Sequence, residues 1–323
     1  MIRALSKITR SVAMTVTSIM LFLPQAFLRH LRWLQLTLFA QNLDGQVVLI
    51  TGASQGIGRA LAHELYGAGC RLILASRNVE ALEELKQELL QSSDKSPIRI
   101  PCAVQLDLAD HGSFKEKVEE IEGISGPIDI LINNAGMSSR SSVIDMSIHT
   151  LKAVMDVNFI GTVELTREFL PHFLKRKKGH IVNITSIQSY LAVPHRCAYS
   201  ASKHALLAFT DTLRAEVAQT GISVSSISPG YVNTNIAKNS LNGDGTNYGR
   251  FDKANLDGYS AEEMAALIKS SIQLRENEVL IAPPIHRFAT FLRFVCPSLF
   301  ALIMARRAIT TDPKLTNAST KQD

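Results

Sequence analysis

The chain has 323 residues, enough for one large domain with appendages, and 46% of the residues are hydrophobic. Its formal net charge of +5 comes from a leader over residues 1–43, which contains five basic and no acidic residues. The remaining residues contain 29 basic and 29 acidic side chains and are therefore balanced in charge. A balanced body argues against a nucleic-acid partner, and the four cysteines are too scattered for a disulfide framework or a metal site.

The leader contains a candidate membrane anchor. Residues 11–28 carry no charge over eighteen positions, between Arg10 and Arg29, which is just long enough to span about 30 Å of hydrocarbon. We expect a retained signal anchor in the endoplasmic reticulum membrane, with a peroxisomal or mitochondrial membrane as alternatives. No clear cleavage site precedes Arg29, which argues against a cleaved signal peptide. The long apolar run argues against a mitochondrial presequence.

A strand, a glycine-rich turn and a helix are predicted next. Residues 46–50 form a β-branched apolar run typical of a buried strand, and a helical pattern follows over 59–66. Gly52 permits a tight turn, Gly56 lets the backbone approach a pyrophosphate, and Gly58 lets the helix pack on the strand. The alternative is a purely structural turn. We expect a dinucleotide at the helix start, in contact with Thr51, Gly52, Ser54, Gln55, Gly56, Ile57 and Gly58.

The next strands suggest how the cofactor is selected. The strand predicted over 71–75 is followed by Arg77 rather than an acid, which favours the 2′-phosphate of NADP(H) over NAD(H). The alternative is an Arg77 that only solvates the next helix. Strands over 98–106 and 128–133 also end in polar residues, where ligands bind in open α/β sheets. We expect cofactor contacts there from Asp107, Leu108, Asn134, Ala135 and Gly136. These elements predict a doubly wound parallel sheet of the Rossmann type over residues 44–284.

Tyr199 and Lys203 form a candidate catalytic pair. In a helix, residues four apart share one face. An ammonium beside a phenol lowers the tyrosine pKa from about 10 toward neutrality, which suits a general acid or base. A surface pair on an amphipathic helix is the alternative.

Together, these motifs resemble the classical short-chain dehydrogenases/reductases over residues 44–284. The resemblance implies a tetrad in which Tyr199 exchanges the substrate proton and Ser186 binds the carbonyl oxygen. Lys203 would hold the nicotinamide ribose and lower the Tyr199 pKa, and Asn158 would position a relay water. The resemblance also implies cofactor contacts from Tyr199, Lys203, Pro229, Gly230, Val232 and Thr234.

The second half contains the motifs Ser186-Ile187-Gln188, Leu213-Arg214-Ala215-Glu216 and Ser228-Pro229-Gly230-Tyr231. With these motifs it is similar to the dehydrogenase/reductase SDR family member 7B group. This resemblance implies NADPH-dependent interconversion of a ketone and a secondary alcohol on a lipid-like substrate, with acyl- or alkyl-dihydroxyacetone phosphate first and a steroid or retinoid second. The alternative of another class is a catalytically silent, cofactor-binding membrane scaffold. The family also implies a possible homodimer through helices over 151–174 and 198–219, which the sequence leaves open.

Other segments bear on substrate and membrane. Arg140 or Arg196 is expected to bind a substrate phosphate, beside Ser186, unless both are solvated surface arginines. Residues 233–258 suit a mobile substrate lid. The apolar extension over 285–309 is interrupted by Arg293 and Pro297, and its uncharged piece over 294–305 is too short to span a bilayer. We expect the extension either in the membrane interface or packed over the cleft or a partner subunit. Residues 310–323 form a polar tail, expected to be disordered.

Overall fold

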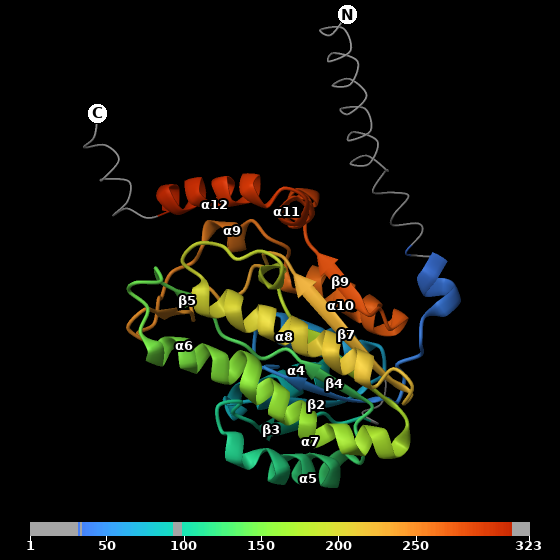
Figure 1. Cartoon of the computed structure of the whole chain (residues 1–323). Helices are drawn as coiled ribbons and strands as arrows, with labels where there is room; N and C mark the ends of the chain where they lie inside the picture. The colour runs from blue at the N-terminus through green and yellow to red at the C-terminus, as the bar shows by residue number, and fades with distance from the viewer. Residues whose placement is uncertain (1–31, 33, 93–98, 312–323) are drawn as a thin grey trace, which may run out of the picture. The chain divides into compact units, whose positions relative to one another are not determined.

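The computed structural model describes residues 32, 34–92 and 99–311 (Figure 1). The anchor predicted over 11–28 and the tail from residue 312 lie outside these residues. Chain contacts divide the protein into two units, residues 1–42 and 43–323, and the second contains the folded body. Within the described ranges, none of the helices has the length and apolar character needed to cross a bilayer.

A seven-stranded parallel sheet forms the centre of the body, as predicted. β1 pairs on one side with β2 and on the other with β4, so the strand order reverses direction next to β1. Ligands bind at such a switch point in doubly wound sheets. The order across the sheet is β3, β2, β1, β4, β6, β7 and β9. These strands span Cys102–Gln105, Arg71–Ser76, Val47–Thr51, Ile130–Asn133, Gly179–Ile184, Ile222–Pro229 and Glu278–Ile281.

Helices cover both faces of the sheet and bury two apolar cores. On one face, Leu61, Leu85 and Ile268 belong to a core beneath three helices, α3 (Gly56–Gly67), α4 (Val79–Gln91) and α10 (Ala261–Leu274). On the other face, Phe114, Phe169 and Leu213 belong to a core beneath α5 (Phe114–Ser125), α7 (Gly161–Arg176) and α8 (Cys197–Glu216). The central strands β1 and β4 are buried from both sides, which explains their continuous apolar sequences.

The long helix predicted over 151–174 is not a single α-helix. It consists of α6 (Ile148–Met155), a π-helical turn over Asp156–Ile160, and α7. Apolar periodicity continues through the turn, so the sequence pattern did not reveal it. π-turns inside helices are frequent at functional sites, and this one contains Asn158, which is fully buried.

The segment predicted as a lid is tied to the body at several points. Its strand β8 (Leu241–Asn242) pairs with β5 (Ser139–Arg140) in a small second sheet. It also holds the short helix α9 (Lys253–Leu256), where Asn255 donates to the Val232 carbonyl over 3.1 Å. Short 3₁₀ turns lie at His111–Ser113 and Ile187–Ser189.

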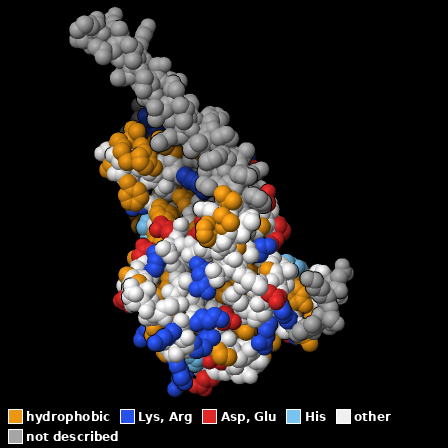
Figure 2. All heavy atoms as spheres, turned by 90° about the vertical axis from the view of Figure 1, so that its right-hand side faces the viewer, with side chains coloured by type: hydrophobic (Ala, Val, Ile, Leu, Met, Phe, Trp, Pro, Cys, Tyr) orange, Lys and Arg blue, Asp and Glu red, His pale blue; other side chains and the backbone are white. Residues whose placement is uncertain are grey.

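The apolar extension forms two helices, α11 (Pro284–Val295) and α12 (Pro297–Thr311), so helical structure continues into the first two residues of the expected polar tail. Both lie at the upper side of the body in Figure 1, and Figure 2 shows hydrophobic side chains gathered at that end. Ala289 and Phe300 pack on a small core of Ile187, Leu191 and Ala282.

Candidate active site

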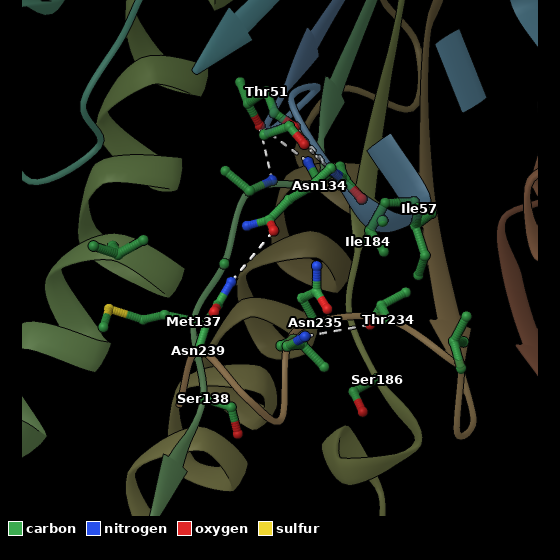
Figure 3. Close-up of a pocket in the computed structure, with 18 of the residues that line it drawn as sticks. Thr51, Ile57, Asn134, Met137, Ser138, Ile184, Ser186, Thr234, Asn235 and Asn239 are labelled. Atoms are coloured by element: carbon green, nitrogen blue, oxygen red, sulfur yellow. Dashed lines mark hydrogen bonds between the residues drawn. The ribbon is translucent and has the colours of Figure 1, made fainter. Parts of the chain in front are cut away.

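A cavity of about 510 Å³ lies at the carboxyl ends of the central strands (Figure 3). It is lined by the first glycine turn, the ends of β2 and β4, Tyr199 and Lys203 of α8, and the start of the 233–258 segment. Two predicted site residues, Gly58 and Asn158, are not part of the lining. The predicted residues that line it are Thr51, Gly52, Ser54, Gln55, Gly56, Ile57, Arg77, Asp107, Leu108, Asn134, Ala135, Gly136, Arg140, Ser186, Arg196, Tyr199, Lys203, Pro229, Gly230, Val232 and Thr234.

The glycine turn is braced by the next strand end. Gly52 has a φ of +66°, and a Cβ there would lie 2.8 Å from the Ala135 Cα. A Cβ on Gly58 would lie 2.3 Å from the Gly52 carbonyl oxygen, so only glycine fits at the helix start. Asn134 donates from Nδ2 to the Thr51 carbonyl over 2.9 Å, and Thr51 Oγ1 accepts from the Asn134 and Ala135 amides (Figure 3). Asn134 therefore holds the turn in shape, a role that the sequence did not indicate.

Arg77 occupies the position predicted for cofactor selection. It follows β2, is exposed, and lines the cavity. Across the residues that the structure describes, its guanidinium makes no hydrogen bond or ion pair. Ser76 and Asn78 on either side bond to each other, and the Asn78 side chain caps α4 by accepting from the Ala81 amide. The Arg77 charge is therefore available at the cavity edge.

Tyr199, Lys203 and Ser186 meet in the cavity as predicted. The Lys203 Nζ lies 6.0 Å from the Tyr199 ring centroid and donates to the Ile184 carbonyl over 2.9 Å. The Ser186 hydroxyl hydrogen-bonds to Tyr199 and also accepts from the Gln188 amide over 3.1 Å. All three side chains are nearly buried, at 4% to 9% exposed.

The predicted lowering of the Tyr199 pKa by Lys203 is wrong for this structure. Burial raises the pKa of Tyr199, while the hydrogen bond from Ser186 and the charge of Arg140 act in the opposite direction. Burial also lowers the pKa of Lys203 from 10.5 to about 8. Loss of water is the largest cause for Tyr199 and the cause for Lys203, because both groups are buried.

Asn158 lies behind the catalytic side chains. Its Oδ1 accepts from the Met137 amide and its Nδ2 donates to the Met137 carbonyl, both over 2.8 Å. The same Nδ2 donates to the Ser202 hydroxyl over 2.9 Å. The side chain thus joins the strand end after β4 to α8, next to Lys203. Its implied role in positioning a water stays a prediction.

Arg140 and Arg196 are not the solvated surface arginines considered as the alternative. Both donate to a single oxygen, Oδ2 of Asp252, over 2.7 Å. Their side chains are only 9% and 15% exposed, and Arg140 also lies over the Tyr248 ring. The Nη1 of Arg196 is buried without a hydrogen-bond partner among the described residues. Arg140, Arg196 and Asp252 thus form an arginine cluster, which has one excess positive charge beside the cavity.

Asp252 and Gln188 were missed by sequence reasoning. Asp252 lies 112 residues from Arg140 in the chain, inside an irregular segment that offers no periodic signal. Gln188 lines the cavity and accepts from the Ser200 hydroxyl over 2.8 Å. Its position two residues after Ser186 was the only available clue.

Comparisons with known proteins agree with this geometry. The chain matches the family described as short chain dehydrogenase over residues 46–244. A Drosophila melanogaster protein, dehydrogenase/reductase SDR family protein 7-like, is 44% identical over 93% of this chain and 90% of its own length. The Bos taurus dehydrogenase/reductase SDR family member 7B is 43% identical over 86% of this chain and 85% of its own length.

Solved structures share the fold. A short chain dehydrogenase/reductase from Burkholderia phymatum in complex with NAD has a TM-score of 0.69 and 26% identity, covering 80% of this chain and 96% of that chain. A short chain dehydrogenase from Burkholderia cenocepacia in complex with NADP has a TM-score of 0.66 and 25% identity, covering 82% and 99%. The neighbours thus include both cofactors and do not decide between them.

Proposed function

Because the chain belongs to the short-chain dehydrogenase/reductase family, as its motifs indicated, we propose that it is an NADPH-dependent oxidoreductase that reduces a lipid-like ketone to a secondary alcohol. Acyl- or alkyl-dihydroxyacetone phosphate is the leading substrate. One observation carries the proposal: a single cavity contains the braced glycine turn and the Ser186, Tyr199 and Lys203 side chains.

The protein's part in the reaction follows from these groups. The bound nicotinamide supplies the hydride. Burial keeps the Tyr199 phenol protonated near pH 7, so it is ready to donate a proton to the oxygen of a ketone. Ser186 is placed to donate a second hydrogen bond to the same oxygen, which stabilises the developing alkoxide charge. Lys203 keeps an ammonium beneath the phenol and supports the charge left on Tyr199.

The preference for NADPH rests on Arg77. A guanidinium at the end of β2 pairs with a 2′-phosphate, which NAD(H) lacks. Charge-assisted hydrogen bonds of this kind contribute about 1.5–3 kcal/mol. We expect Arg77→Glu to weaken NADPH binding by roughly 10- to 100-fold while NADH binding changes little or improves. Equal losses for both cofactors in fluorescence titrations contradict the role of Arg77.

A phosphate on the substrate is supported by the arginine cluster. Two guanidiniums share one carboxylate oxygen, and the buried Nη1 of Arg196 has bonding capacity left over within the described part of the chain. A substrate phosphate satisfies both the charge and the free donor. We expect Arg196→Ala to raise KM for a phosphorylated ketone far more than for its dephosphorylated counterpart.

Arg140→Ala is the companion variant, since Arg140 also positions Ser138 through a 2.6 Å hydrogen bond. It is expected to reduce turnover of both substrates in addition to raising KM for the phosphorylated one. Equal losses on both substrates in Arg196→Ala exclude a phosphate role for the cluster. A steroid or retinoid ketone then becomes the better candidate, because such substrates carry no anionic group.

Residues 11–28, outside the described part, are proposed to anchor the protein in the endoplasmic reticulum membrane. Arginines in place of Met20 and Leu23 oppose insertion by about 3 kcal/mol each near the bilayer centre. The doubly substituted protein is expected in the supernatant after carbonate extraction of cell membranes, whereas the native protein stays in the pellet. If carbonate also extracts the native protein from the membranes, the proposal that residues 11–28 anchor it is wrong.

A further inference from the structure

The two C-terminal helices turn apolar side chains away from the body. Nine large hydrophobic residues of α11 and α12 are between 43% and 73% exposed, with Phe291 at 60% and Phe294 at 73%. Phe288 and Phe291 also contact each other, with ring centroids 6.4 Å apart. The nine are Ile285, Phe288, Phe291, Phe294, Val295, Leu299, Leu302, Ile303 and Ile309.

Polar side chains of the same helices bond to the body. Arg293 of α11 donates to the Tyr190 carbonyl and lies 3.0 Å from His204 Nε2. Arg287 donates to the Leu280 carbonyl over 2.8 Å. A helix on a water-soluble protein normally buries its apolar stripe and exposes its charges. Here large apolar side chains are exposed beside the arginines, and the bonds from Arg287 and Arg293 fix the helices in place, which indicates that the outer face meets an apolar medium.

The size and charge of this face identify the medium. Nine side chains exposed to this extent amount to on the order of 900 Å², above the 300–600 Å² of the largest patch on a typical monomer. Residues 283–311 contain four arginines and no acidic residue. Such a face repels a second copy of itself, whereas it complements a bilayer that presents anionic headgroups over an apolar interior.

We propose that α11 and α12 dock in the interface of an anionic lipid bilayer, with the phenylalanines of α11 inserted among the acyl chains. The docked face adjoins the cavity. Tyr231 lines the cavity, its hydroxyl accepts from Arg307 of α12 over 3.0 Å, and its ring lies 5.4 Å from that of His286 of α11. Docking therefore holds this side of the cavity at the membrane. The entry of a lipid substrate by this route rests on the proposed function, but the docking itself does not.

Depth-dependent fluorescence quenching tests the docking in the full-length protein. Trp33, the only tryptophan, is replaced by Phe, and a single tryptophan is introduced as Phe294→Trp. The matched control is Ile124→Trp, at a position that is 54% exposed. Ile124 belongs to α5, a helix at the opposite end of the body from α11 and α12 in Figure 1. Both proteins are placed in phosphatidylcholine–phosphatidylserine vesicles with and without acyl-chain-brominated phosphatidylcholine.

Brominated lipid is expected to reduce the Phe294→Trp emission at least about twofold and to leave the Ile124→Trp emission nearly unchanged. Any anchoring by residues 11–28 is common to both variants and so does not produce this difference. Absence of quenching at position 294 overturns the proposal. Cross-linking then shows whether a second copy covers the face or whether the face is in contact with solvent alone. The readout needs no turnover, so a failure of the proposed reaction leaves this result intact.

Substrate entry has its own test. Phe291→Ser and Phe294→Ser remove exposed rings and spare the packed residues Ala289 and Phe300. With both changes, KM for a vesicle-borne ketone is expected to rise several-fold, while KM for a short-chain, water-soluble ketone stays the same. An equal change for both substrates contradicts entry from the membrane.

Discussion

Replacing Lys203 by Met is expected to stabilise the protein while abolishing its activity. Burial lowers the pKa of the Lys203 ammonium from 10.5 to about 8. This corresponds to about 3 kcal/mol opposing folding at neutral pH. Loss of the bond from Nζ to the Ile184 carbonyl offsets about 1 kcal/mol of the gain. With an unfolding entropy of about 2.1 cal/mol/K per residue over the folded body, the net gain of about 2 kcal/mol predicts a Tm higher by roughly 3–4 °C at pH 7.

The stability gain depends on pH in a defined direction. Below pH 8, Lys203 is protonated in both the folded and the unfolded state, so the full cost of the buried charge is present. Between pH 8 and 10.5 the unfolded chain still binds the proton and the folded protein does not, so the stability of the native protein rises with pH. The advantage of the Met variant should therefore shrink across this window.

Thermal unfolding followed by circular dichroism at several pH values between 7 and about 10 measures this difference without added cofactor. The raised pKa values of Tyr199 and Cys70 affect both proteins and largely cancel in the comparison. Lys175→Met, an exposed lysine of α7, is the control and should change stability by less than about 0.5 kcal/mol. A Met variant that is less stable than the native protein at pH 7, or whose advantage is equal at every pH, refutes the reasoning.

Two further predictions concern the cofactor turn and the arginine cluster. Gly58→Ala places a Cβ 2.3 Å from the Gly52 carbonyl oxygen and should weaken NADPH binding at least about tenfold by fluorescence titration, whereas Gly67→Ala, with no atom within 4 Å, should not. Equal affinities in the two alanine variants contradict the role of the close contact. Asp252→Asn leaves two partly buried guanidiniums without their shared carboxylate and should cost about 3 kcal/mol of stability. Inorganic phosphate should then raise the Tm of this variant more than that of the native protein, and equal responses count against an anion site.

The sequence predicted best what local spacing determines. Gly52, Gly56 and Gly58 mark a strand, a turn and a helix within a few residues, and the strand-end residues line one cavity because parallel strands end on one side of the sheet. The i, i+4 spacing likewise placed Tyr199 and Lys203 on one face of α8.

Features set by distant contacts or by burial were not predictable. The Asp252 carboxylate reaches Arg140 across 112 residues of sequence, and the π-turn around Asn158 leaves no mark in the apolar periodicity. The direction of the Tyr199 pKa was predicted wrongly because the spacing shows the neighbouring lysine but not the loss of water around both groups. Dimer formation through α7 and α8 stays a prediction.

The central claim is that Tyr199 donates the proton in an NADPH-dependent ketone reduction. NADPH oxidation by the detergent-purified protein across a panel of lipid ketones, with Tyr199→Phe beside it, tests this claim most directly. We expect turnover of at least one phosphorylated lipid ketone, a loss of roughly 10²- to 10⁴-fold in the Phe variant, and unchanged NADPH binding. Undiminished turnover in Tyr199→Phe, or no oxidation of NADPH with any ketone, contradicts the account, and the second result favours a cofactor-binding protein without catalysis.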